Sequence, residues 1–92
     1  MKRVEISAQA RSDIQYLRHW LAERSPNASR RATETIVAAA RSLGDFPMRG
    51  RLTLEDIREL PISFGSAGYV LQYFVEGDRV VIARVFHSLE RR

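Results

Sequence analysis

Three side chains suited to acid–base or phosphate chemistry lie in the second half of the chain. His87 can transfer a proton, and Arg58 and Arg84 can stabilise negative charge on a phosphate group. Arg91 and Arg92 add two cations shortly after the last apolar stretch. This basic end of the chain is therefore a candidate catalytic site, a candidate docking site for another macromolecule, or a solvated tail.

A regular strand would keep two of these groups apart. Side chains alternate between the two faces of a strand, so Arg84 would share one face with Ile82 and Phe86. His87 would lie on the other face, together with Val85. A catalytic site that uses both residues then requires a bulge, or a strand that ends near Phe86.

Arg84 also needs a partner, because an unpaired charge in an apolar strand is costly. Either a structural ion pair or a binding role would meet this need, and the same choice applies to Arg58. Candidate intramolecular partners are Glu59, Glu76 and Glu90 for Arg84, and Glu55 and Asp56 for Arg58.

Two further groups of side chains could contact a partner. Arg49 and Arg51 flank Gly50 in a loop, where they either contact a target or are simply solvated. Tyr16 and Trp20 are four residues apart beside the apolar stripe of a predicted helix, so they either contact a partner or pack within the fold.

Composition indicates an ordinary globular protein with a basic surface. The 92 residues allow one domain spanning 1–92, and the net charge of +4 favours nucleic acid or acidic protein partners. Cysteine is absent, which excludes disulfides and thiolate zinc sites and suits a cytoplasmic location. No apolar run reaches the roughly 18 residues of a membrane helix, and no signal peptide is visible. We therefore expect no membrane association, metal or cofactor.

Apolar periodicity predicts an α+β fold in the order β-α-α-β-β-β. A short N-terminal strand precedes a helical hairpin, which packs on a mostly antiparallel sheet whose last three strands form a meander. Ser7 and Ser25 are suitable N-caps, and Pro61 is expected to mark a sheet edge or the exit from its strand. The helices are expected at Ala8 to Glu23 and Pro26 to Leu43, and the strands at Lys2 to Ser7, Ile57 to Ile62, Tyr69 to Val75 and Arg79 to Phe86.

Five stretches follow one another along nearly the whole chain: VEISAQARSDIQYLRHWL, SPNASRRATETIVAAARSL, FPMRGR, IRELPI and GYVLQYFVEGDRVVIARVFH. In this order, and with this length and charge, they resemble the RelE/ParE superfamily of bacterial type II toxins, most closely its ParE branch. The chain departs from the family at Ala8, where proline is frequent. It also departs after His87, where three residues precede Arg91 although an arginine usually follows closely.

The resemblance implies a cytoplasmic toxin with a RelE/ParE-like fold, neutralised by a cognate antitoxin encoded beside it. ParE-like toxins trap DNA gyrase on cleaved DNA, whereas RelE-like toxins are metal-independent, ribosome-dependent mRNA endonucleases. RNA cleavage needs a base, an acid and cations around the phosphate, and only Arg58, Arg84 and His87 are candidates here. This incomplete set favours a gyrase poison. The alternatives are a RelE-like endonuclease and a non-toxic member of the fold.

Partner contacts can be assigned as expectations on the same basis. The antitoxin is expected to lay a helix in a groove and to add an acidic strand to an open sheet edge. Its expected contacts on this chain are Tyr16, Trp20 and Arg58. The expected contacts with gyrase, or alternatively with the ribosome and mRNA, are Arg84, His87, Arg91, Arg92, Arg49 and Arg51.

Overall fold

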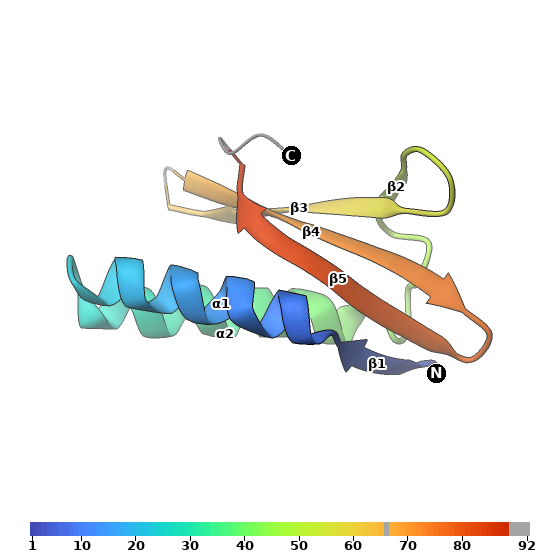
Figure 1. Cartoon of the computed structure of the whole chain (residues 1–92), viewed down its shortest axis with the longest axis horizontal. Coiled ribbons are helices and arrows are strands. Elements are labelled where there is room, and N and C mark those ends of the chain that lie inside the picture. The colour runs from blue at the N-terminus through green and yellow to red at the C-terminus, as the bar shows by residue number, and fades with distance from the viewer. Residues whose placement is uncertain (66, 89–92) are drawn as a thin grey trace.

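The computed structural model describes residues 1–65 and 67–88, which form two helices and a five-stranded sheet (Figure 1). The strand order is β1-β5-β4-β3-β2; β1 runs parallel to β5, and every other neighbouring pair is antiparallel. This confirms the predicted α+β fold. The elements are β1 (Arg3–Ile6), α1 (Ala8–Ala22), α2 (Pro26–Ser42), β2 (Arg51–Leu52), β3 (Arg58–Phe64), β4 (Ala67–Glu76) and β5 (Arg79–His87).

Both helices begin at the predicted serine caps. The Ser7 hydroxyl accepts a hydrogen bond from the Ala10 amide at 3.1 Å, and Ser25 caps α2 in the same way at 3.2 Å. Glu23 and Leu43, predicted as the last helical residues, are the C-caps instead. Within the described residues, neither helix is long and apolar enough to cross a membrane.

The sheet differs from the prediction at its β3 margin. β3 continues through Pro61 to Phe64, two residues beyond its predicted end at Ile62. The unpredicted two-residue strand β2 pairs only with Arg58 and Glu59. Pro61 pairs with Val70 of β4, but within the described residues no strand lies on its β2 side. It therefore lies at a sheet edge, and its missing N–H breaks no ladder there.

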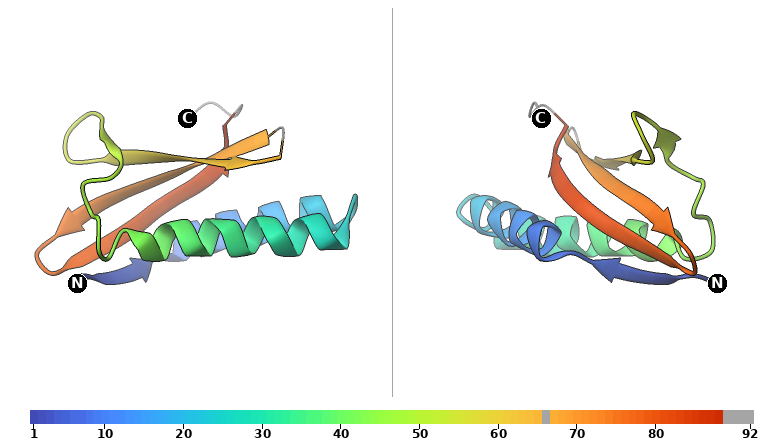
Figure 2. Two further views of the ribbon diagram at one scale, coloured as in Figure 1. Left: turned by 180° about the vertical axis from the view of Figure 1, so that it is seen from behind. Right: turned by 45° about the vertical axis from the view of Figure 1, so that its right-hand side comes forward.

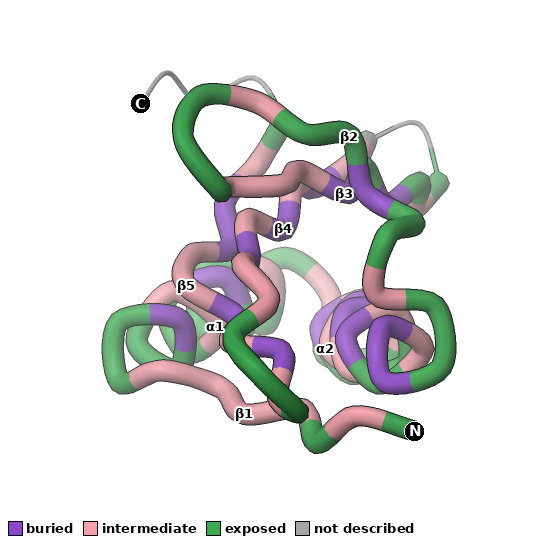
Figure 3. Tube along the Cα trace, turned by 90° about the vertical axis from the view of Figure 1, so that its right-hand side faces the viewer, coloured by how far each residue is buried: buried purple, intermediate pink, exposed green. Residues whose placement is uncertain are grey.

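The apolar core lies between the helical hairpin and one face of the sheet. Both helices lie on the same side of the sheet (Figure 2), and buried positions on helices and strands face one another across this layer (Figure 3). Alanines on the buried helix faces allow close approach. The core includes Ala10, Leu17, Ala32, Ile36 and Ala40 from the helices and Leu60, Leu71, Tyr73, Ile82 and Val85 from the strands.

Candidate functional site

Arg84 lies directly after an irregularity in β5. Tyr73 of β4 faces Ile82, but the next residue of β4, Gln72, faces Arg84. Ala83 is therefore an extra residue on β5 and forms a β-bulge. The β1 ladder ends at Ile82, so from this point β5 borders α1 rather than β1.

The bulge changes which residues share a face. His87 lies opposite Tyr69, which is buried against the helices, so His87 and Val85 lie on the same face as Ile82. The predicted grouping of Arg84 with Ile82 is wrong, because the regular alternation breaks between them. Arg84 and His87 still lie on opposite faces of the strand, as the alternation beyond the bulge requires.

Arg84 is paired with Asp13 of α1. Its Nε donates to Asp13 Oδ2 at 2.9 Å, and its Nη2 donates to Asp13 Oδ1 at 3.3 Å. The Asp13 side chain is 10% exposed and that of Arg84 is 34% exposed. Of the predicted partners, Glu59 binds Gln72 and Glu76 binds Arg79, while Glu90 lies outside the described residues.

Asp13 anchors the exposed side of β5 through more than this pair. Its Oδ2 also accepts the Val85 amide at 2.9 Å, and Oδ1 accepts from Gln9 Nε2 at 3.2 Å. Burial favours the neutral carboxyl group, but the hydrogen bonds from Arg84, Val85 and Gln9 and the charge of Arg84 outweigh it. The pKa of Asp13 is therefore lowered from its ordinary value, and the carboxylate is charged at neutral pH.

Ser7 supports the neighbouring part of the same strand. Its amide donates to the Ile82 carbonyl at 3.0 Å, and its hydroxyl donates to the Ala83 carbonyl at 3.1 Å. Together, Ser7 and Asp13 bind backbone groups of β5 where β1 no longer covers them. The start of α1 is therefore fixed to the bulge by hydrogen bonds as well as by apolar contacts.

His87 faces an aromatic hollow beside α1. Its ring meets Tyr69 edge-on, with centroids 5.8 Å apart and an interplanar angle of 83°. It lines a hollow of about 260 Å³ together with Tyr16, Leu17 and Trp20. Tyr16 is 63% exposed and Trp20 is 44% exposed, so these rings are presented to solvent rather than packed in the core.

Arg58 holds the loop between α2 and β2. Its Nη1 donates to the Gly50 carbonyl at 2.8 Å. The buried hydroxyl of Tyr73 accepts the Gly50 amide at 2.8 Å and donates to the Pro47 carbonyl at 2.7 Å. A Cβ at Gly50 would lie 2.7 Å from the Tyr73 ring, so only glycine allows this contact without a shift. The side chain of Arg58 therefore fixes a loop instead of projecting freely.

The loop presents cations and apolar side chains together. Arg49 and Arg51 are exposed, but Arg51 is the first residue of β2 and not part of the loop as expected. Arg49 donates to the Ser42 hydroxyl at 2.7 Å, and Arg51 lies 3.7 Å from Glu59. Phe46 and Met48 are exposed in the same loop and line a shallow hollow of about 640 Å³. This surface suits contact with a larger molecule better than the enclosure of a small one.

The structure brings the predicted residues to two separate places. Arg84 and His87 both lie along α1, the first at Asp13 and the second at the aromatic hollow. Arg58 lies beneath the loop, with Arg49 and Arg51 nearby. Arg91 and Arg92 lie outside the described residues. Among residues 1–65 and 67–88, no three His, Cys, Asp or Glu side chains are grouped to bind a metal.

The sequence reasoning missed Asp13 and the hydrogen bonds of Tyr73. Asp13 is three residues before Tyr16 and seven before Trp20, so helical spacing places it on the same flank of α1. That spacing was the available signal for a carboxylate beside β5. The two hydrogen bonds of the Tyr73 hydroxyl had no comparable signal, because the residue reads as an apolar core position.

The chain is similar to known toxins over its whole length. Residues 4–92 match the family described as "ParE toxin of type II toxin-antitoxin system, parDE". Toxin RelE3 of Caulobacter vibrioides is 50% identical over 92 residues, covering 100% of each chain. Toxin RelE1 of the same organism is 39% identical over 89 residues, covering 97% of this chain and 96% of its own.

A solved structure shares the fold at low sequence identity. The structure described as "Chromosomal ParDE TA system from P. aeruginosa" superposes with a TM-score of 0.77 and 19% identity. The match covers 95% of this chain and 96% of the other. The helical hairpin and sheet are therefore a shared architecture rather than a peculiarity of this sequence.

Proposed function

The chain belongs to the ParE toxin family of type II toxin–antitoxin systems, and from this premise we propose that it poisons DNA gyrase by binding it. Membership of the family also implies a cognate antitoxin as a partner. In this mode of action, the basic surfaces of the chain contact a macromolecule and do not cleave a bond.

The pairing of Arg84 with Asp13 is the observation that carries this proposal. Cleavage of RNA requires cations that can move onto the crowded phosphate and proton-transfer groups within hydrogen-bond reach of it. Arg84 is held by a carboxylate 2.9 Å away, and Arg58 by a loop carbonyl 2.8 Å away. These contacts support a structural use of both guanidinium groups and disfavour a catalytic one.

We assign the target contact to the exposed basic groups. Arg49 lies in the loop whose backbone is held by Tyr73, and Arg51 begins β2 directly after it, so both are presented in a defined geometry at low entropic cost. Arg91 and Arg92 are assigned to the same role from their position in the sequence. Guanidinium groups suit both carboxylates and phosphates, so they can contact gyrase and its DNA alike.

The antitoxin is assigned in part to the aromatic hollow beside α1. Tyr16 and Trp20 are exposed, and large aromatic rings that lose contact with water frequently anchor protein interfaces. Arg24 stacks on Trp20 with its guanidinium 3.6 Å from the ring centroid, which keeps this ring oriented. Arg58 lies apart from this hollow, beneath the loop between α2 and β2, so in this proposal its side chain contributes only by fixing that loop.

A ribosome-dependent mRNA endonuclease is the second candidate function. It is favoured by one observation: the relatives that are 50% and 39% identical are named RelE toxins. In this case Arg84 would exchange Asp13 for a phosphate oxygen, and His87 would transfer the proton. A member of the fold without toxicity is the third candidate.

The deciding experiment measures both activities with one protein preparation. Purified chain is added to gyrase with relaxed plasmid and ATP, and separately to a reconstituted translation reaction. We expect blocked supercoiling with accumulation of linear DNA, and unchanged translation. Intact supercoiling with mRNA cut on ribosomes would establish the endonuclease instead, and the absence of both effects would leave the non-toxic member.

Two variants test the assignment of the target contact. Replacing Arg49 and Arg51 together by glutamine removes two exposed charges from the loop and the start of β2, so gyrase inhibition should weaken about tenfold or more. Arg30→Gln removes an exposed charge of α2 and serves as the control. Antitoxin binding should survive in both proteins, and equal inhibition by both would refute the assignment.

A further inference from the structure

The outer side of the helical hairpin, away from β3, β4 and β5, is largely uncovered. Among the described elements only β1 approaches it, at the end where α1 begins and α2 ends (Figure 3). Two hollows lie where the helices meet. One of about 540 Å³ includes Arg11 and Arg41 in its lining, and one of about 300 Å³ includes Arg18 and Ser29. We call the surface formed by Arg11, Arg18 and Arg41 the outer seam.

The arginines of the outer seam are not paired with carboxylates of this chain. Arg11 and Arg18 are seven residues apart on α1, so they leave the same flank of the helix two turns, or about 10.5 Å, apart. All three arginines are exposed, and none forms an ion pair within the described residues. Two carboxylates lie within the helices: Asp13 binds Arg84 beside β5, and Glu34 is exposed on α2. The outer seam is therefore positively charged.

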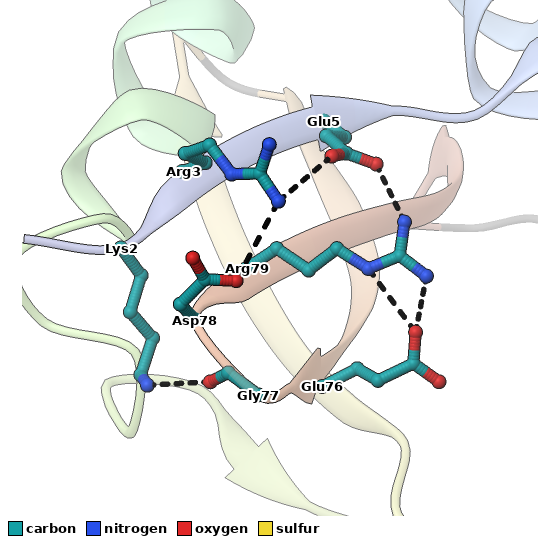
Figure 4. Close-up of polar contacts among 7 residues, drawn as sticks. All are labelled: Lys2, Arg3, Glu5, Glu76, Gly77, Asp78 and Arg79. Atoms are coloured by element: carbon teal, nitrogen blue, oxygen red, sulfur yellow. Dashed lines mark hydrogen bonds and ion pairs between the residues drawn. The ribbon is translucent and has the colours of Figure 1, made fainter.

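The acidic residues at the adjoining end of the sheet do not neutralise the outer seam. Glu5 lines the larger hollow, but its carboxylate binds Arg79 at 2.8 Å and lies 4.0 Å from Arg3 (Figure 4). Arg79 also binds Glu76, and Arg3 lies 3.5 Å from Asp78. The charges at this end of the sheet compensate one another, so the arginines of the outer seam determine the charge that a ligand meets there.

The outer seam has no exposed apolar side chain of the kind that anchors a protein partner. Among the described residues of the two helices, the exposed large apolar side chains are Tyr16 and Trp20, and both line the aromatic hollow with His87 on the other flank of α1. Interfaces between proteins have an apolar core, whereas interfaces with DNA are more polar and strongly positive. Guanidinium groups also bind phosphate oxygens with two parallel hydrogen bonds. The outer seam therefore suits a phosphodiester backbone better than an acidic protein.

We propose that the outer seam binds the phosphate backbone of duplex DNA directly, without the help of gyrase. Packed helices lie about 8–10 Å apart, and the minor and major grooves of B-DNA are about 6 and 12 Å wide. Arg11 and Arg18 on α1 therefore reach phosphates on one side of a groove, and Arg41 on α2 reaches those on the other. A single strand has no second row of phosphates to meet both helices. The choice of DNA rests on the proposed function, because a gyrase poison acts where duplex DNA is bound.

Fluorescence anisotropy of a short labelled duplex of mixed sequence, titrated with the purified chain in the absence of gyrase, tests this contact. Each neutralised phosphate contributes about −0.9 to the slope of log affinity against log salt concentration, so three contacts give a slope of about −3. Replacing Arg11 and Arg18 together by glutamine should reduce the steepness of this slope by about 2 and weaken binding about tenfold or more at low salt. Replacing both by lysine keeps the charges and should preserve the slope.

A matched control removes two exposed charges from elsewhere on the chain. Replacing Arg24 and Arg31 by glutamine lowers the net charge by the same amount, but these side chains lie over the rings of Trp20 and Phe64, away from the outer seam. This protein should keep the slope and the affinity of the parent. Equal losses in the two glutamine variants, or no binding of the duplex by the parent at low salt, would overturn the inference.

Two other ligands and the supercoiling assay complete the test. Single-stranded RNA or polyglutamate bound as tightly as the duplex, with the same loss in the variant lacking Arg11 and Arg18, would overturn the assignment to duplex DNA. A parent chain that binds the duplex but does not block supercoiling supports the inference and refutes the proposed target. A chain that blocks supercoiling without binding the duplex does the reverse.

Discussion

Replacing Asp13 by asparagine isolates the contribution of its carboxylate with almost no change in shape. The two carboxylate oxygens receive hydrogen bonds from Arg84, Val85 and Gln9, at distances from 2.9 to 3.3 Å. Asparagine keeps one acceptor oxygen and turns the other into an amide donor that faces N–H groups. The variant therefore loses the ion pair and leaves at least one donor of this cluster without an acceptor.

The size of the effect follows from the exposure of the two partners. A hydrogen bond to a charged group contributes about 1.5–3 kcal/mol, and an unsatisfied buried group costs a similar amount. The Arg84 side chain is 34% exposed, so water replaces part of what it loses. We expect the free energy of unfolding to fall by about 2 kcal/mol, which lowers the Tm of a domain this small by about 8–16 °C.

Thermal and urea unfolding at neutral pH, followed by circular dichroism, measure this loss. Glu34→Gln is the matched control, because it removes one exposed negative charge from α2 and no ion pair of the described residues. We expect this control to differ from the parent by less than about 0.5 kcal/mol. An Asp13→Asn protein as stable as the control would refute the anchoring role of the carboxylate.

The pH dependence provides a second check with a defined sign. The pKa of Asp13 is lowered in the folded chain from its ordinary 3.8, so the unfolded chain takes up the proton first as the pH falls. The stabilisation is therefore complete above the unfolded pKa and is lost as the pH falls through the folded pKa. The stability gap between parent and Asp13→Asn should close below about pH 4 and stay constant from pH 6 to 8.

Three further substitutions probe other contacts. Tyr73→Phe removes the hydroxyl that bridges Gly50 and Pro47, so the free energy of unfolding measured in urea should fall by about 1–3 kcal/mol. Tyr16→Phe at an exposed position is the control and should leave this free energy unchanged. Gly50→Ala places a methyl group against the Tyr73 ring, so a Tm lowered by several degrees is expected, and an unchanged Tm would contradict this packing. Ser7→Ala removes an N-cap and a hydrogen bond to β5, so the free energy of unfolding measured in urea should fall by about 1–2 kcal/mol. An unchanged free energy of unfolding would show that the cap is dispensable.

The helices and the meander were predictable because each follows from a pattern of residues that are close together in the sequence. Apolar residues at 4-3-4 spacing placed Ala10 and Leu17 on the inner face of α1, and both are buried. Serine at each helix start and Gly77 in the β4–β5 turn mark boundaries by their own conformational preferences, and Gly77 has a φ of +60°. Such signals involve neighbours in sequence, so no knowledge of the tertiary arrangement is needed.

The bulge had no local signal, and the ion pair had only the helical spacing that places Asp13 on one flank of α1. The stretch VVIARVF is evenly apolar around Arg84 and contains no glycine or proline to mark Ala83 as an extra residue. Asp13 and Arg84 are 71 positions apart, and any of several carboxylates met the requirement for a partner equally well. Which one does so depends on where α1 crosses β5, and that crossing is set by packing of the whole hairpin on the sheet.

The parallel pairing of β1 with β5 sets the order in which the protein can be completed. β1 is the first strand to be synthesised and β5 the last, and the contact of Ser7 with Ala83 spans 76 positions. Contacts of such long range slow folding, because a large loop must close before they form. A growing chain on the ribosome therefore holds an unpaired β1 until β5 emerges. The surfaces that depend on the pairing of β1 with β5 therefore form only after β5 has been synthesised.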